Sequence, residues 1–565
     1  MTRPRLAFAA LASILLAPSV AQAGGFYLAP RGVRPLSRGG AYIAGVEDPL
    51  ALWYNPAGLA YSGDQLLLDA NLTLFEAWYE RVDSGGTVLP EAHGYHGYLP
   101  IPTIAGSFGF DDAPEWTFAL GIAAPNSVLS VWPNEPEAPQ RYSLLSLEGS
   151  LLLSVNGGVA WRPIEEFSIG LAAHVLIGSF DATVALSACD GTICAFPEDP
   201  EYDGVANISL PSVFPFFVLG TTIDLDMVRI GLSVATPFNL EGTANVRVRP
   251  PSAAAFQGAE VVNRRPGCDY ENPDAPCRDD TVARSQLEFP WVLRVGVEVR
   301  PVPELRVELA AVYETWSVQD AARIDPEDVW IQNALGGGLE YQVGPVDIPR
   351  NMNDTISVRL GGAYTIEEMV TIRAGVSYEN SAFSDEWLTV LTIDSDKVIV
   401  SGGVGIDVSP EVSIDVNVGY AWLAPRNVTN SMVPQANPIR PPMSDVGAVF
   451  VGNGTYDTSA PFFGLGMRWR LDAGNVPSPG GDDEAEEPAE EEPAEEVTPP
   501  EPDVEPAPPE GDEGAAAEPA DGDQPWYLRG RDGATGDEAE PEPEVQETPR
   551  QRRRRLRRER QQRQR

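Results

Sequence analysis

Few side chains in this sequence have the type and spacing that enzymatic or metal-binding chemistry requires. The three histidines are His93, His96 and His174, and none of them belongs to an H-E-x-x-H metal motif. A Walker phosphate loop and the G-x-S-x-G nucleophile elbow are also missing. His93 and His96 share their segment with Tyr95 and Tyr98, which favours a solvated loop over a surface metal site. The residues therefore predict no catalytic group, no metal site and no cofactor, so the chain is expected not to be an enzyme.

The four cysteines lie in two local pairs, Cys189 with Cys194 and Cys268 with Cys277. No histidine lies near either pair, which favours two loop disulfides over the alternative of a metal site. Disulfide bonds persist only in an oxidising compartment. The pairs are therefore consistent with export of the chain.

Residues 1–23 are predicted to be a signal peptide. Arg3 and Arg5 precede an apolar stretch over residues 6–16, and an A-x-A cleavage site follows at residues 21–23. A membrane anchor is the alternative, but this apolar stretch is too short to span a bilayer. The mature chain is therefore expected to begin at Gly24.

The charged residues are unevenly distributed along the chain. The sequence has 83 acidic and 39 basic residues, a formal net charge of −44. Residues 472–549 are mostly Glu, Asp, Pro, Ala and Gly, and residues 550–565 are mostly Arg and Gln. Neither stretch can bury enough apolar surface to offset its ordering entropy, so an acidic disordered linker and an Arg-rich tail are predicted. The remaining basic residues are scattered among acids, which argues against a nucleic-acid partner.

From Gln65 to Leu471 the dominant pattern is alternation of apolar and polar residues, the period of a strand with two different faces. In one segment Val412, Ile414 and Val416 alternate with Ser413 and Asp415. We count about fourteen such segments, which predicts an all-β fold. The clearest are residues 291–299, 305–313, 356–364, 370–378 and 412–420.

The connections between these segments alternate between short turns and long insertions. Outer-membrane β-barrels have this property, because their periplasmic turns are short, their extracellular loops are long and their strand number is even. The sequence therefore predicts a transmembrane antiparallel β-barrel of about 14 strands. The short turns are Asp111–Glu115, Arg162–Glu165, Asp224–Asp226, Pro301–Pro303, Thr365–Glu368 and Ser409–Pro410, and the long insertions lie near 81–100, 125–146, 186–207, 249–284, 320–352, 381–395 and 424–456.

Aromatic residues cluster at both ends of the predicted strands, as the two interfacial girdles of a membrane barrel require. At the short-turn ends these are Trp116, Trp161 and Trp469, and at the long-loop ends Trp78, Tyr79, Tyr378, Tyr420 and Trp422. Charged residues on the predicted lumen face are expected to pair across strands and to solvate a plug, with contact to a ligand carboxylate as the alternative. They are Arg294, Glu298, Arg306, Glu308, Arg359, Arg373, Asp415 and Arg468.

Residues 24–62 precede the first predicted strand and lack the alternating pattern. They contain Gly-Phe at 25–26, Arg-Gly-Gly-Ala at 38–41 and Tyr-Asn-Pro-Ala-Gly at 54–58. Together with the barrel pattern, these motifs resemble the FadL/TodX-type long-chain fatty acid and hydrocarbon transporters of Gram-negative outer membranes. The resemblance covers about residues 24–471. Further matches are Ala124-Pro125, Arg141-Tyr142 and Gly454-Thr455-Tyr456.

The resemblance implies that residues 24–62 form a hatch that plugs a barrel over residues 63–471. The expected partners are a long-chain fatty acid or another hydrophobic small molecule and outer-membrane lipid, and the expected state is a monomer. The ligand would leave sideways into the membrane through a break in the third strand. The residues carried over by the match are Phe26, Tyr27 and Leu28 for ligand binding and Asn55, Pro56 and Ala57 for the hatch motif, with Gly121 and Pro125 as candidates for the break.

The long C-terminal tail is a departure from the family, whose barrels usually end at the last strand. An even-stranded barrel places this tail in the periplasm, where its Arg-rich end would bind an anionic envelope component or fold back on the acidic linker. Two rival functions follow: a structural barrel that tethers the envelope through the tail, and an outer-membrane lipid hydrolase. Under the transport hypothesis, uptake should survive deletion of the tail.

Overall fold

The computed structural model describes residues 31–96, 101–124, 130–147, 150–189, 194, 196–264, 282–334, 338–391, 393–437 and 449–471. Several predictions made above lie outside these residues: the signal peptide, Phe26, Tyr27, Leu28, Pro125, the pair Cys268 and Cys277, the acidic linker 472–549 and the Arg-rich tail 550–565. None of the described helices has the length and apolar composition that a membrane-spanning helix requires.

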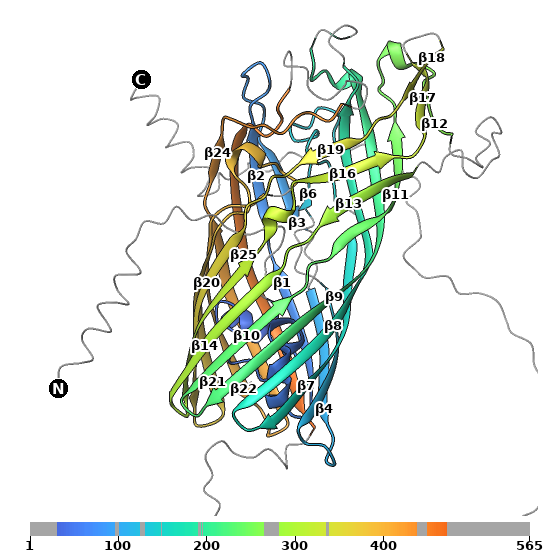
Figure 1. Cartoon of the computed structure of the whole chain (residues 1–565). Coiled ribbons are helices and arrows are strands. Elements are labelled where there is room, and N and C mark those ends of the chain that lie inside the picture. The colour runs from blue at the N-terminus through green and yellow to red at the C-terminus, as the bar shows by residue number, and fades with distance from the viewer. Residues whose placement is uncertain are drawn as a thin grey trace, which may run out of the picture. The chain divides into compact units, whose positions relative to one another are not determined.

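Fourteen antiparallel strands form a closed ring in which each strand pairs with its neighbour and the last pairs with the first (Figure 1). The predicted all-β barrel is therefore confirmed. Its strands are β1 (Gln65–Thr73), β4 (Ile101–Gly109), β5 (Trp116–Ala123), β7 (Leu151–Ile164), β8 (Phe167–Ser187), β9 (Asp203–Leu225), β10 (Val228–Ala235), β14 (Val292–Val302), β15 (Leu305–Glu314), β20 (Thr355–Ile366), β21 (Val370–Glu379), β22 (Lys397–Asp407), β23 (Val412–Leu423) and β25 (Gly454–Arg470).

The long insertions contain strands of their own, and most of these were not among the segments predicted from alternation. A separate three-stranded sheet joins segments some seventy residues apart, because Glu260 pairs with Gln332. Such pairings depend on tertiary contacts and leave no period in a short segment. The additional strands are β2 (Glu76–Arg81), β3 (Ala92–His96), β6 (Ser130–Val131), β11 (Asn239–Arg249), β12 (Glu260–Asn263), β13 (Val282–Glu288), β16 (Ala321–Pro326), β17 (Val329–Ala334), β18 (Leu339–Gln342), β19 (Val346–Pro349) and β24 (Arg426–Val428), and short 3₁₀ turns lie at Pro200–Tyr202, Ala254–Phe256, Trp316–Val318 and Asp385–Trp387.

The outer surface of the barrel carries the apolar residues of each strand and the lumen carries the polar ones. Leu293, Leu309 and Leu360 are about half exposed on the outside, whereas Glu298 and Glu308 are fully buried inside. Trp116 and Trp161 stack on each other at the short-turn end, and Trp422 is exposed at the long-loop end. The pattern is that of a barrel with an apolar belt and two aromatic girdles.

Tyr79 is an exception to the predicted girdle, and its placement there was wrong. It is 1% exposed, its ring stacks on that of Tyr456, and its hydroxyl lies 2.9 Å from the carbonyl oxygens of Val451 and Asn453, either of which can accept its proton. Neighbouring residues of a strand point to opposite faces. Since Trp78 is on the outside, Tyr79 must point into the barrel.

The outward position of Leu360 at the centre of β20 makes it a test of the lipid-facing belt. We expect Leu360→Arg to lower the free energy of unfolding in lipid vesicles by about 2–4 kcal/mol, the cost of an arginine at the bilayer midplane. Val88→Arg is the control, because Val88 is exposed in the connection between β2 and β3. Equal stability of both variants in a denaturant titration would contradict the assignment of this face to lipid.

The N-terminal segment preceding β1 lies inside the ring of strands. It contains α2 (Val33–Ser37), α3 (Ala51–Tyr54) and the 3₁₀ helix η1 (Pro56–Tyr61), and nearly all of its side chains are buried. Figure 1 shows these blue helices within the barrel, towards its short-turn end. We call residues 31–62 the plug.

Candidate functional site

The hatch motif fastens the plug to one side of the barrel wall. The side-chain amide of Asn55 donates to the Ile43 carbonyl within the plug and to Thr221 and Thr222 of β9, over 3.0–3.2 Å. Its side-chain oxygen accepts from the Ala57 N–H and so caps η1, with Pro56 in the first position of that helix. One side chain therefore joins two plug segments to the wall.

A second attachment lies on β14 and β15, which follow β9 and β10 in the ring, and it was not assigned from the sequence. Arg38 of the plug pairs with Glu298 of β14 at 2.9 Å and with Glu308 of β15 at 3.3 Å. The Glu308 carboxylate also accepts the backbone N–H groups of residues 43–45, over 2.6–3.1 Å. All these groups are buried, so the plug backbone supplies donors where a free carboxylate would be strongly disfavoured.

The remaining lumen charges form similar pairs. Glu47 of the plug pairs with Arg229 and Arg306 of the wall at 2.8 and 2.7 Å. On the wall itself, Asp415 pairs with Arg373 at 2.6 Å and with Arg468 at 3.4 Å. These contacts confirm that charged residues on this face pair with one another and with the plug.

Glycines of the wall allow the plug backbone to approach closely. A Cβ on Gly375 would overlap the carbonyl of Arg38, and one on Gly361 would overlap the same group. On the plug side, Gly39 has a φ of +62°, and a Cβ there would lie 2.7 Å from the Val376 nitrogen. At these positions backbone packs directly against backbone, with no side chain between plug and wall.

His174 is a further contact residue that was not predicted, because no sequence motif surrounds its position on the inner face of β8. Its Nε2 lies 3.0 Å from the Leu52 carbonyl of the plug, so this nitrogen is assigned as the donor. Its ring stacks on Phe216 with a centroid distance of 4.5 Å and lies 6.0 Å from Trp53. It begins a ladder of neighbouring rings that continues through Phe216, Phe238, Phe289 and Trp316.

An apolar cluster of buried residues extends from the plug to the long connections. It joins Leu36 of the plug to wall residues such as Ile399 and Phe462 and to residues of several long connections. We call this group the luminal apolar cluster. Its connection residues include Trp132, Leu144, Trp316, Met352, Phe383, Leu388 and Val390. A hydrophobic molecule that enters between the loops would meet this cluster before it meets the plug.

The wall is closed at Gly121, the first candidate for a lateral opening. Gly121 pairs with Ala105 of β4 and with Asn156 of β7, and the ladder of β5 ends at Ala123. A Cβ on Gly121 would lie 3.1 Å from the Trp53 ring, so this position touches the plug. Pro125 lies outside the described residues.

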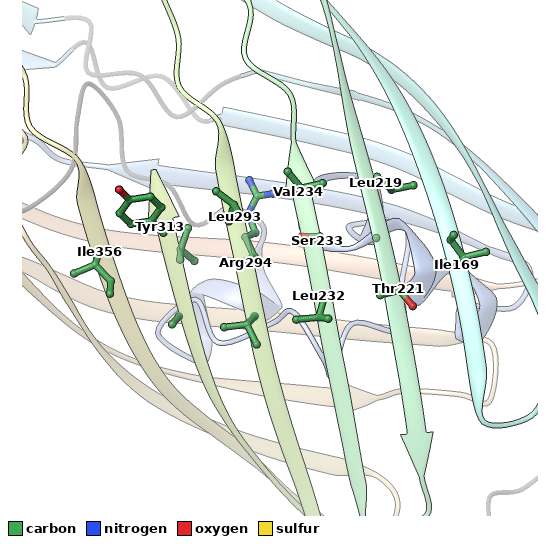
Figure 2. Close-up of a pocket in the computed structure, with 14 residues that line it drawn as sticks. Ile169, Leu219, Thr221, Leu232, Ser233, Val234, Leu293, Arg294, Tyr313 and Ile356 are labelled. Atoms are coloured by element: carbon green, nitrogen blue, oxygen red, sulfur yellow. The ribbon is translucent and has the colours of Figure 1, made fainter. Parts of the chain in front are cut away.

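A hollow of about 530 Å³ lies on the outer wall, over the part of β9 and β10 whose inner side holds the plug (Figure 2). Its lining includes the outward residues Leu219, Leu232, Leu293, Tyr313 and Ile356, which are largely apolar and exposed. The ladders that join β9, β10, β14 and β15 are continuous behind it. The hollow therefore faces the lipid side and gives no path into the lumen.

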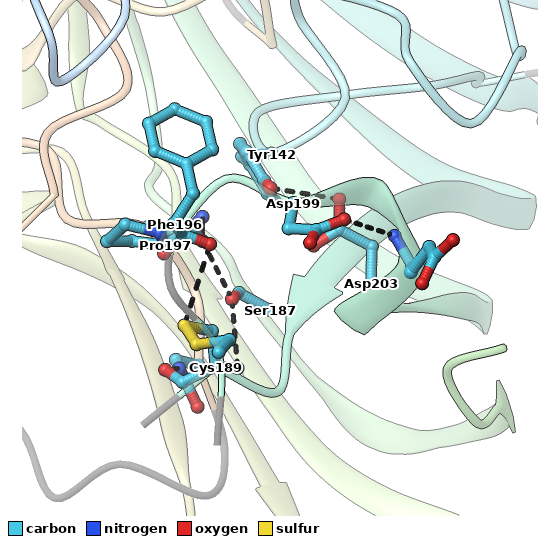
Figure 3. The surroundings of a disulfide bond; sticks show 11 residues. Tyr142, Ser187, Cys189, Phe196, Pro197, Asp199 and Asp203 are labelled. Atoms are coloured by element: carbon cyan, nitrogen blue, oxygen red, sulfur yellow. Dashed lines mark hydrogen bonds between the residues drawn. A yellow bond between two sulfur atoms is a disulfide. The ribbon is translucent and has the colours of Figure 1, made fainter. Parts of the chain in front are cut away.

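The long connections near β8 and β9 are held by a disulfide and by buried polar contacts (Figure 3). Cys189 is bonded to Cys194. Arg141 pairs with Asp203 at 2.7 Å, and the Tyr142 hydroxyl donates to the same carboxylate. Burial raises the pKa of Tyr142 well above its usual value, so this hydroxyl keeps its proton. Within the described residues, no group of three or more His, Cys, Asp or Glu side chains is placed to hold a metal ion.

Comparison with known proteins supports this assignment of the fold. A family profile described as outer membrane protein transport protein (OMPP1/FadL/TodX) matches residues 14–470. A solved FadL homologue from Pseudomonas aeruginosa has a TM-score of 0.62 and 18% identity, covering 79% of this chain and 100% of the other. The toluene transporter TbuX of Ralstonia pickettii has a TM-score of 0.51 and 14% identity, covering 78% of this chain and 99% of the other. The toluene transporter TodX of P. putida has a TM-score of 0.51 and 15% identity, covering 78% of this chain and 98% of the other. No curated protein sequence matches significantly. The length of the profile match shows that this chain belongs to the OMPP1/FadL/TodX family of outer-membrane transport proteins.

Proposed function

We propose that this protein takes up hydrophobic molecules passively across the outer membrane, with long-chain fatty acids as the foremost ligands. The observation that carries the proposal is the arrangement of the lumen, where the luminal apolar cluster adjoins a plug that is buried in the bore. Burial of each methylene contributes about 0.8 kcal/mol, so capture of an acyl chain needs no chemical step.

In the proposed path, the ligand passes the long loops, enters the luminal apolar cluster and reaches residues 24–28 of the hatch. A shift of this segment would then release the ligand towards the third strand. Gly121 and Pro125 remain the proposed positions of the lateral exit, and the contact of Gly121 with Trp53 supports a link between plug movement and that strand.

Aromatic hydrocarbons are the second candidate ligands. The stacked rings of Phe216, Phe238 and Phe289 favour flat aromatic molecules. The structural relatives TbuX and TodX are named as toluene transporters. Competition between toluene and a labelled fatty acid would rank the two ligand classes.

We expect Phe26→Ala, or removal of residues 24–28, to weaken binding of a labelled fatty acid by detergent-purified protein about tenfold or more, the loss expected when a buried aromatic contact is removed. Phe110→Ala is the matched control, because Phe110 is exposed at the short-turn end. Unchanged affinity in the Phe26 variants would show that the first residues of the hatch do not contact the ligand.

A further inference from the structure

Buried cations in the described residues almost all have a carboxylate partner. Eight buried Arg and Lys side chains form ion pairs with Asp or Glu: Arg38, Arg81, Arg141, Arg229, Arg359, Arg373, Lys397 and Arg468. Arg350 differs from them. Its side chain is buried, with 6% of the residue exposed, and among the described residues no carboxylate oxygen lies within ion-pair distance.

The polar contact of the Arg350 guanidinium is a neutral amide. Its Nη1 donates to the Gln319 side-chain oxygen at 3.1 Å, while the Gln319 amide nitrogen donates to the Glu288 carbonyl at 2.8 Å. The second bond fixes which end of the Gln319 amide faces Arg350. The backbone is also held, since the Arg350 N–H donates to the Asp320 carbonyl at 2.7 Å. The fold therefore positions the cation, and no charge of the described part of the chain neutralises it.

Arg350 keeps its charge in this place. Burial lowers the pKa of Arg350 to about 10, which still leaves the guanidinium protonated at neutral pH. A buried charge without a counter-ion is costly, and its removal from water is normally offset by a paired opposite charge. The folded protein therefore carries the desolvation penalty of an unpaired buried guanidinium. Such a penalty is expected where a ligand supplies the opposite charge.

The surroundings of the guanidinium belong to the luminal apolar cluster. Its central carbon lies 5.9 Å from the centroid of the Phe383 ring. Met352 and Phe383 are buried members of the cluster, and Trp316, another member, lies three residues before Gln319. An amphiphilic ligand could therefore place its charged headgroup at the guanidinium and its apolar chain against the luminal apolar cluster.

We propose that Arg350 binds the carboxylate of an amphiphilic ligand whose apolar chain packs on the luminal apolar cluster. The inference rests on the proposed function and deepens it, because it assigns the headgroup contact to one residue and predicts selection of acids over neutral molecules. A guanidinium can hold a carboxylate through two parallel hydrogen bonds.

The test compares oleate with oleyl alcohol, which share one apolar chain and differ in the headgroup. Binding is measured on the full-length protein in detergent. We expect the wild type to bind oleate about tenfold or more tightly than the alcohol, as a charged hydrogen bond predicts. Arg350→Gln should lose this preference while its affinity for oleyl alcohol stays unchanged, and Arg350→Lys should retain part of it.

Arg323→Gln is the matched control, because Arg323 lies in the same connection but is exposed and paired with Asp347. A barrel that migrates as a folded species before heating excludes misfolding of the variants. If the wild type binds oleate and oleyl alcohol equally, the assignment of Arg350 is overturned, while the proposed uptake of hydrophobic molecules is not. The same holds if Arg350→Gln keeps the full preference for oleate. Failure of the wild type to bind either molecule would overturn the proposed uptake of fatty acids as well.

Discussion

Gly375→Ala is expected to unseat the plug and to turn the closed barrel into a leaking channel. The added Cβ would overlap the carbonyl of Arg38 and the nitrogen of Gly39, both of which are backbone groups that cannot rotate away. Overpacking of this kind costs about 1–3 kcal/mol. If the barrel wall holds, that energy raises the population of the displaced plug about five- to 150-fold. Single-channel conductance in planar bilayers measures this population directly.

The barrel wall is expected to hold because β21 is paired on both sides along its whole length, through Gly361 and Ser401 at this position. Gly402→Ala is the matched control: it lies on the neighbouring strand, and its Cβ would lie 3.3 Å from the Arg373 carbonyl and touch no plug atom. A Gly375→Ala protein that stays as closed as Gly402→Ala would refute the tight seal between Gly375 and the plug.

Glu308→Ala is expected to loosen the plug through electrostatics. The change removes one partner of Arg38 and leaves the N–H groups of residues 43–45 without their acceptor. Removal of one member of a buried ion pair typically costs about 3–5 kcal/mol. Amide hydrogen exchange at Ile43 and Ala44 should therefore accelerate by more than a hundredfold, by the conversion of about 1.4 kcal/mol per tenfold.

Glu308→Gln and Glu304→Ala give the comparison for this result. The glutamine keeps one acceptor oxygen but loses the charge, so an intermediate exchange rate is expected. Glu304 is exposed in the turn between β14 and β15 and has no plug contact, so its loss should leave the exchange unchanged. Slow exchange in Glu308→Ala would mean that the glycine contacts and Asn55 hold the plug without this carboxylate.

Sequence alternation was sufficient to predict the barrel because a strand between lipid and a polar lumen must change polarity at every residue. The same rule assigned Leu293 to the outside and Glu298 to the inside. The prediction failed for Tyr79, which was placed in the girdle because it is aromatic, although its neighbour Trp78 already occupies the outer face and adjacent strand residues point to opposite faces. It also failed for β12, β17 and β18, whose pairing joins distant segments.

Some of the contacts between plug and wall could likewise be predicted from the sequence, and others could not. Asn55 was named through the resemblance of residues 54–58 to a family motif, which is a contiguous stretch that the sequence displays locally. Arg38 and Glu308 are 270 residues apart, and nothing near either residue indicates the other. Arg350 is a stronger case, because what distinguishes it is that no carboxylate of the described residues lies within ion-pair distance, and only packing decides this.

The sequence by itself determined the closed barrel, the alternation of short and long connections and the presence of a segment before the first strand. Each follows from local periodicity or from composition. Tertiary structure alone decided which wall residues hold that segment and how closely the glycines let it approach. It also decided which buried cation has no carboxylate partner among the described residues. These properties depend on distances between strands that only the closure of the barrel brings together.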